Sequence, residues 1–122
     1  MFKFETLNIW KEAVNFISEI YKLTKKFPNW ETYSLTSQLT RAATSVSLNI
    51  AEGSSRESKK DFKRFIQISL GSLNEVVTCL YVAKNENYIN STEFKKTYER
   101  CEEISKMLYG FNKYLERSST IN

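Results

Sequence analysis

Two stretches of this chain are almost free of charge in a sequence that is otherwise densely charged. Residues 32–51 contain a single charged side chain, Arg41, and residues 65–83 contain a single one, Glu75. Elsewhere charge is frequent, because the 122 residues include 18 Lys and Arg and 14 Asp and Glu. The solvent side of a helix normally carries such residues. The two stretches therefore predict a central pair of helices that is wrapped by other helices or by neighbouring subunits, with one buried charge of each sign.

Neither stretch predicts a membrane span, although both approach the length that a spanning helix needs. Both are rich in Ser, Thr, Asn and Gln, a composition too polar for lipid. No apolar run with a small-residue cleavage site follows Met1. We therefore expect a soluble, cytoplasmic protein without a membrane partner. Cys79 and Cys101 lie in apolar helical patterns, and core thiols are favoured over a disulfide.

The spacing of apolar residues predicts one all-α domain over residues 1–122, an antiparallel up-down-up-down four-helix bundle. Short connections between successive helices imply that neighbours are antiparallel. The expected helices cover about residues 6–26, 30–53, 58–85 and 91–116, and the tail 117–122 is expected to fray.

Residues that end or cap helices set these bounds. Pro28 ends the first helix, because proline disfavours helical geometry in the residue before it. Gly53 is expected to end the second helix in the left-handed conformation. The last two helices each begin with the spacing of a capping box, formed by Ser58 with Asp61 and by Asn90 with Glu93.

Periodicity also assigns a buried face to each helix. The first helix is expected to bury Leu7, Trp10, Val14, Ile17, Tyr21 and Thr24. The third is expected to bury Phe62, Phe65, Ile66, Ser69, Leu73, Val76, Leu80 and Ala83. One side of the second helix is small and uncharged, and comprises Thr36, Thr40, Ala43, Thr44, Ser47 and Ala51. We expect this side to meet protein, and predict that Lys at Ala43 or Ser47 weakens a subunit interface.

The residues offer little for catalysis. The chain has no histidine, the commonest general base and metal ligand. Asp61, the single aspartate, serves as a cap, and the cysteines lack the spacing of a zinc site. Glu99, Glu102 and Glu103 could in principle bind a metal, but carboxylates on a lysine-rich helix are usually solvated. We therefore predict no enzyme activity, no cofactor and no metal.

A set of polar residues is expected to be buried by this arrangement: Arg41, Asn49, Glu52 and Glu75. A buried charge without compensation is too costly to retain. Arg41 and Glu75 are therefore expected to satisfy each other or nearby polar groups, either within a subunit or between subunits. A catalytic use of the four residues is the least favoured alternative.

Basic residues crowd the corner between the second and third helices, and they are Arg56, Lys59, Lys60, Lys63 and Arg64. Amide groups at the start of a helix also favour anions. Clusters at residues 22–26 and 95–100 belong to the opposite pole of an antiparallel bundle. Phosphate binding and plain solubility explain the corner equally well.

The run QLTRAATSVSLNIAEG at residues 38–53, followed by GSLNE at 71–75, resembles the four-helix bundle proteins encoded in 23S rRNA intervening sequences. LNIWKEA at 7–13, IYKLT at 20–24 and Phe27-Pro28 fit the same pattern, so the resemblance covers about residues 4–115. It implies a bundle that assembles into a ring, commonly a pentamer, with no established catalytic role. It also suggests kinship with the accessory protein of diversity-generating retroelements, a basic pentamer that binds nucleic acid and a reverse transcriptase.

The preferred hypothesis is a non-enzymatic homo-oligomer, with a pentameric ring favoured, that binds RNA or a nucleoprotein through its basic surfaces. Such binding, to RNA or DNA, is expected to be electrostatic and weakly sequence-selective, because no base-reading module is recognised. The rival is a scaffold that binds another protein and has no direct role with nucleic acid.

Overall fold

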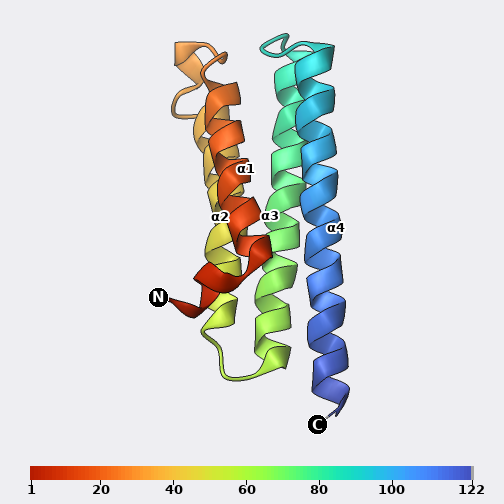
Figure 1. The fold of residues 1–122 in the computed structure, drawn as a ribbon. Coiled ribbons are helices and arrows are strands. Elements are labelled where there is room, and N and C mark those ends of the chain that lie inside the picture. Colours follow the sequence, from red (N-terminus) through yellow and green to blue (C-terminus); the bar gives the residue numbers. More distant parts are fainter. Residues whose placement is uncertain (122) are drawn as a thin grey trace.

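The computed structural model describes the backbone of residues 1–121 and the side chains of residues 1–117. Its helices are α1 (Asn8–Thr24), α2 (Leu35–Ser54), α3 (Lys59–Asn85) and α4 (Ser91–Ile121), with short 3-10 helices η1 (Lys3–Thr6) and η2 (Asn29–Glu31). Successive helices run in opposite directions, and the α2–α3 turn lies at the far end from the other two connections (Figure 1). The predicted all-α, antiparallel up-down four-helix bundle is confirmed.

Each helix packs against the next one in the chain, and contacts between α1 and α4 close the bundle. The core between them excludes water from large apolar side chains, the main driving force for folding. Its fully buried members come from every helix and include Phe16, Ile20, Leu39, Ile50, Ile66, Leu80, Ile104 and Leu108.

Two helix bounds differ from the prediction by five residues, and the others agree within two. The segment after Pro28 first forms η2, and α2 begins only at Leu35, because Ser34 has the non-helical angles φ −125° and ψ −104°. The carboxylate of Glu31 accepts a hydrogen bond from the Leu35 amide at 3.2 Å and so caps α2. At the other end, α4 continues to Ile121, past the predicted end at residue 116, because no glycine or proline stops it. Of the predicted frayed tail, side chains 118–121 and Asn122 lie outside the described part.

The two predicted helix caps are present. Ser58 Oγ accepts a hydrogen bond from the Asp61 amide at 3.0 Å. Asn90 and Glu93 form the complete capping box, in which each backbone amide donates to the other's side chain at 2.8 Å.

Gly53 has a different role from the predicted one. It lies inside α2, and none of the described glycines has a positive φ. A Cβ at Gly53 would lie 2.7 Å from Phe62 Cδ1 and 2.8 Å from Phe65 Cβ, distances shorter than real contacts. Gly53 is therefore required for the close approach of α2 and α3, and not for a left-handed turn.

The predicted face of α3 is buried throughout, but that of α1 is partly wrong. Val14 is 36% exposed and Tyr21 52% exposed. The buried residues of α1 are instead Ile9, Ala13, Phe16, Ile20, Leu23 and Thr24. Two neighbouring apolar stripes run along this helix, and periodicity alone does not tell which one faces the bundle axis.

The small, uncharged side of α2 meets protein within the same chain. Ala43 is 0% exposed and Ser47 5% exposed, so both belong to the core of a single bundle. Their small side chains let a neighbouring helix approach closely. The prediction that they form an open subunit interface is therefore wrong, and Lys at either position would disturb folding itself.

By length and composition alone, α3 would pass as a membrane-crossing helix. It nevertheless contacts both α2 and α4 and contributes ten buried residues to the bundle. Its apolar character is that of the core helix of a soluble-type bundle.

Candidate nucleic-acid interface

The basic residues predicted at the corner between α2 and α3 come together around a surface hollow of about 920 Å³. Residues 55–58 turn the chain from α2 into α3, and the first two turns of α3 supply four of the five cations. Lining residues include Arg56, Lys60, Lys63 and Arg64, whereas Lys59 is exposed on the first turn of α3.

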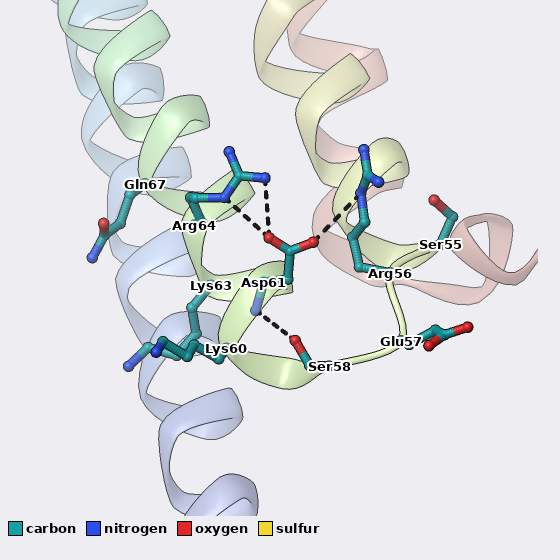
Figure 2. Close-up of a pocket in the computed structure, with 9 residues that line it drawn as sticks. All are labelled: Ser55, Arg56, Glu57, Ser58, Lys60, Asp61, Lys63, Arg64 and Gln67. Carbon is teal, nitrogen blue, oxygen red and sulfur yellow. Dashed lines mark hydrogen bonds and ion pairs between the residues drawn. The ribbon is translucent and has the colours of Figure 1, made fainter.

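Both arginines of the corner point toward one carboxylate (Figure 2). Arg64 Nε and Nη2 lie 3.0 Å from Asp61 Oδ1, and Arg56 Nε lies 3.7 Å from Asp61 Oδ2. Arg56 Nη2 also donates to Glu52 Oε1 at 2.6 Å. The two guanidinium groups lie 4.8 Å and 4.6 Å from the centre of the Phe65 ring. The arginines are therefore held in place, and their charge is partly neutralised within the chain.

The lysines of the corner are less engaged. Lys60 and Lys63 point away from Asp61 (Figure 2). Lys63 Nζ lies 3.5 Å from Glu116 Oε2 on α4, at the exposed edge of the bundle. Lys59 and Lys60 are exposed and form no ion pair among the described residues. Of the five predicted cations, these two are the most available to an external anion.

The residues predicted to be buried and polar are on the surface of the single chain. Arg41, Glu52 and Glu75 are exposed, and only Asn49 is half-buried. Asn49 Nδ2 donates to the Ser45 carbonyl at 2.8 Å and to Ser45 Oγ at 3.0 Å. The burial prediction for the three charged residues is therefore wrong, because no helix of this chain covers that side of α2 and α3.

Arg41 and Glu75 nevertheless lie on opposite sides of one shallow groove between α2 and α3. Both line it together with Ser45 and Ser72, whose hydroxyl groups are hydrogen-bonded at 2.9 Å. Arg41 and Glu75 do not pair with each other within 4.0 Å, nor with another described residue. Pairing within one subunit is therefore not observed, and pairing between subunits stays a prediction.

Sequence reasoning missed an ion-pair network at the opposite pole. The Arg100 guanidinium on α4 is 3.1 Å from Glu12 Oε1 and 3.2 Å from Glu19 Oε2, both on α1. Burial acts to lower the pKa of Arg100, but the hydrogen bond to Glu12 and the charge of Glu19 raise it above its usual value. The seven-residue spacing of the two glutamates on one helix was the available signal. Arg100 is therefore a link between α1 and α4 and not part of a phosphate site.

A second link at this pole joins Lys26 to Glu93. The ion pair with Lys26 and the amide of Asn90 lower the pKa of Glu93 below its usual value. Tyr88 also ties the α3–α4 turn to η2, because its hydroxyl donates to Glu31 Oε2 at 2.8 Å. The hydrogen bond to Glu31 raises the pKa of Tyr88. Lys26 and Arg100 are thus used inside the chain, whereas Lys22, Lys25 and Lys96 are exposed and form no ion pair among the described residues.

The cysteines are free and buried, as predicted. Burial raises the pKa of Cys101 to about 12 and also raises the pKa of Cys79. Since the thiolate is the reactive form, burial lowers the reactivity of both thiols. Within the described residues, no group of three His, Cys, Asp or Glu side chains could hold a metal ion, and Glu99, Glu102 and Glu103 do not form one.

Comparison with known proteins agrees with this architecture. Residues 5–110 match the family described as 23S rRNA-intervening sequence protein. The fold is similar to a crystal structure of a protein with unknown function from the S23 ribosomal protein family of Bacteroides thetaiotaomicron VPI-5482. The two sequences are 25% identical, the TM-score is 0.78, and the match covers 86% of this chain and 98% of that one. No curated protein matches the sequence. The chain belongs to the 23S rRNA-intervening sequence protein family.

Proposed function

We propose that this protein is a non-enzymatic, cytoplasmic homo-oligomer that binds RNA or a nucleoprotein through the corner between α2 and α3. The charge of that corner carries the proposal. Residues 56–64 contain five positive side chains against only Glu57 and Asp61. Lys59 and Lys60 are exposed and have no ion-pair partner among the described residues. Backbone phosphates are the natural ligands of such a surface, and DNA offers the same chemistry.

The homo-oligomer is a closed ring, and the family resemblance favours five subunits. A ring repeats the corner once in every subunit. Two exposed lysines per chain would bind RNA weakly, but several linked sites raise the overall affinity without new contacts. Because phosphates carry no base identity, the ring binds different sequences with similar affinity.

The test measures binding of a fluorescent single-stranded RNA by anisotropy between about 50 and 300 mM salt. Each phosphate contact adds about 0.7 to the slope of log affinity against log salt, so three contacts in each of two subunits give a slope of about 4. Replacing Lys59, Lys60 and Lys63 by Gln should weaken binding to all sequences alike and lower this slope.

The matched control replaces Lys22, Lys25 and Lys96 by Gln, because these exposed lysines lie at the opposite pole and the change in charge is identical. This control should bind RNA nearly as tightly as the unmodified protein. The proposal is wrong if the unmodified protein does not bind RNA or DNA at about 50 mM salt, or if the two triple variants bind equally.

A protein-interaction scaffold is the second candidate. It is favoured by the pairing of both corner arginines with Asp61 and Glu52, which leaves less positive charge for phosphates. In that case the corner serves solubility, and RNA binding is absent while the oligomer still forms.

A further inference from the structure

The outer sides of α2 and α3 have an unusual surface for helices that face solvent. Leu48 is 62% exposed on α2, and Ile68 and Val82 are 41% and 42% exposed on α3. Charge on these sides is confined to Arg41 and Glu75 over residues 32–51 and 65–83. The outer sides of α1 and α4 instead carry many lysines and glutamates. An exposed surface with apolar residues and little charge is typical of an interaction site.

Two hydrogen bonds fix how the levels of α2 and α3 correspond. Ser69 Oγ donates to the Val46 carbonyl at 2.9 Å, and Ser72 Oγ donates to Ser45 Oγ at 2.9 Å. Both helices rise by about 1.5 Å per residue, so equal numbers of residues counted from these contacts reach equal heights. Because the two helices are antiparallel, an increase in residue number along α3 corresponds to an equal decrease in residue number along α2.

This count brings complementary exposed residues to the same height. Counted from the Ser69–Val46 contact, Glu75 is at the height of Thr40, and counted from the Ser72–Ser45 contact it is at the height of Ala42. Glu75 therefore lies level with Arg41, the residue between these two. Ile68 falls in the same way level with Leu48. One level thus has opposite charges on the two helices, and the other has two apolar side chains.

We propose that this surface binds a second copy of the chain, with α2 of one subunit packed beside α3 of the next. A rotation about an axis parallel to the helices leaves every residue at its height. Where α2 of one subunit packs beside α3 of the next around such an axis, Arg41 therefore lies level with Glu75 of the neighbouring subunit, and Leu48 lies level with its Ile68. The surface is thus complementary to itself, because the chain presents both the opposite charges and the apolar side chains that a partner would need. This inference rests on the proposed homo-oligomer and specifies its interface.

The test uses two charge reversals, Arg41→Glu and Glu75→Arg, with mass measured by light scattering after size exclusion. Each variant places like charges at every interface, and its dissociation constant should rise at least about tenfold. Both residues are exposed, so circular dichroism should show unchanged helix content. Lys95→Glu is the matched control, because Lys95 is 79% exposed on α4 and its reversal should leave the mass unchanged.

An equimolar mixture of the two reversed variants separates contacts between chains from contacts within a chain. The glutamate introduced in one variant can pair with the arginine introduced in the other, so the mixture should assemble to a higher average mass than either variant alone at the same total concentration. In a ring of five, at least one interface keeps like charges, so the recovery should be partial. A mixture that assembles no further than either variant alone overturns the intermolecular pair. If the unmodified protein is monomeric at about 50 µM, both the homo-oligomer and this interface are wrong. If it assembles and the reversals assemble equally well, only the interface is wrong.

Discussion

Substitution of Gly53 by Ala tests the close approach of α2 to α3. The added Cβ would lie 2.7 Å from Phe62 Cδ1, 2.8 Å from Phe65 Cβ and 3.1 Å from Phe62 Cε1. The Phe62 ring has little freedom to move away, because it is 8% exposed and packs edge-on against Phe111 at 5.2 Å. The Phe65 Cβ is attached directly to the α3 backbone. Relief of the clash therefore requires α2 and α3 to move apart.

The size of the effect follows from two opposing terms. Overpacking of a close contact costs about 1–3 kcal/mol. Alanine gains about 0.5–1 kcal/mol over glycine inside a helix. The free energy of unfolding of the Gly53→Ala variant should therefore fall by about 0.5–2 kcal/mol.

Gly110→Ala is the matched control, because Gly110 is exposed in α4 and its Cβ would meet nothing within 4 Å. Without a clash, this variant should gain the full helix term of about 0.5–1 kcal/mol. Urea unfolding followed by circular dichroism at one protein concentration measures both changes. A Gly53→Ala variant that is as stable as the Gly110→Ala variant would show that no close approach exists.

The ion pairs allow three further predictions. Asp61→Asn should release Arg56 and Arg64 and tighten RNA binding several-fold in the anisotropy assay, and equal tightening by Glu57→Gln would contradict this. Arg100→Met should lower the free energy of unfolding by about 1–3 kcal/mol, because its side chain is only 17% exposed and joins α1 to α4, whereas exposed Lys95→Met should change it little. The lowered pKa of Glu93 means that its carboxylate stabilises the fold above about pH 4.3 and that this contribution disappears as the pH falls through the folded-state pKa. Glu93→Gln should therefore lower the melting temperature at pH 7 and lower it progressively less as the pH falls through the acidic range, and a loss that does not change with pH would refute the charge effect.

Local signals in the sequence were sufficient for the architecture. Pro28 and the Asn90–Glu93 capping box act within a few residues of the chain, so they locate helix ends without knowledge of the tertiary structure. The buried face of α3 was equally clear, because its apolar residues form one continuous stripe. Predictions of this kind depend only on neighbours along the chain.

The predictions that were wrong or absent involve contacts between distant parts of the chain. Gly53 contacts Phe62 and Phe65 across the helix pair, which a local turn rule does not describe. Arg100 and Glu12 are 88 residues apart in sequence, and the seven-residue spacing of Glu12 and Glu19 places the two glutamates on one face without identifying their partner. The wrong prediction that Arg41 is buried has a different cause. A stretch without charge predicts a covered surface, but it does not say whether the same chain or another copy of it would provide the cover.

The two proposed surfaces depend on one another. A single corner offers only Lys59 and Lys60 without an ion pair among the described residues, and the charges of its arginines are partly neutralised by Asp61 and Glu52. At about 0.7 per phosphate contact in the salt slope, two contacts make a weak, easily screened site. The outer groove of α2 and α3 runs along the helices, whereas the corner is at their end. Assembly through the groove would therefore leave each corner open and place several of them on one face of the ring, where together they would bind an RNA that one corner alone would not retain.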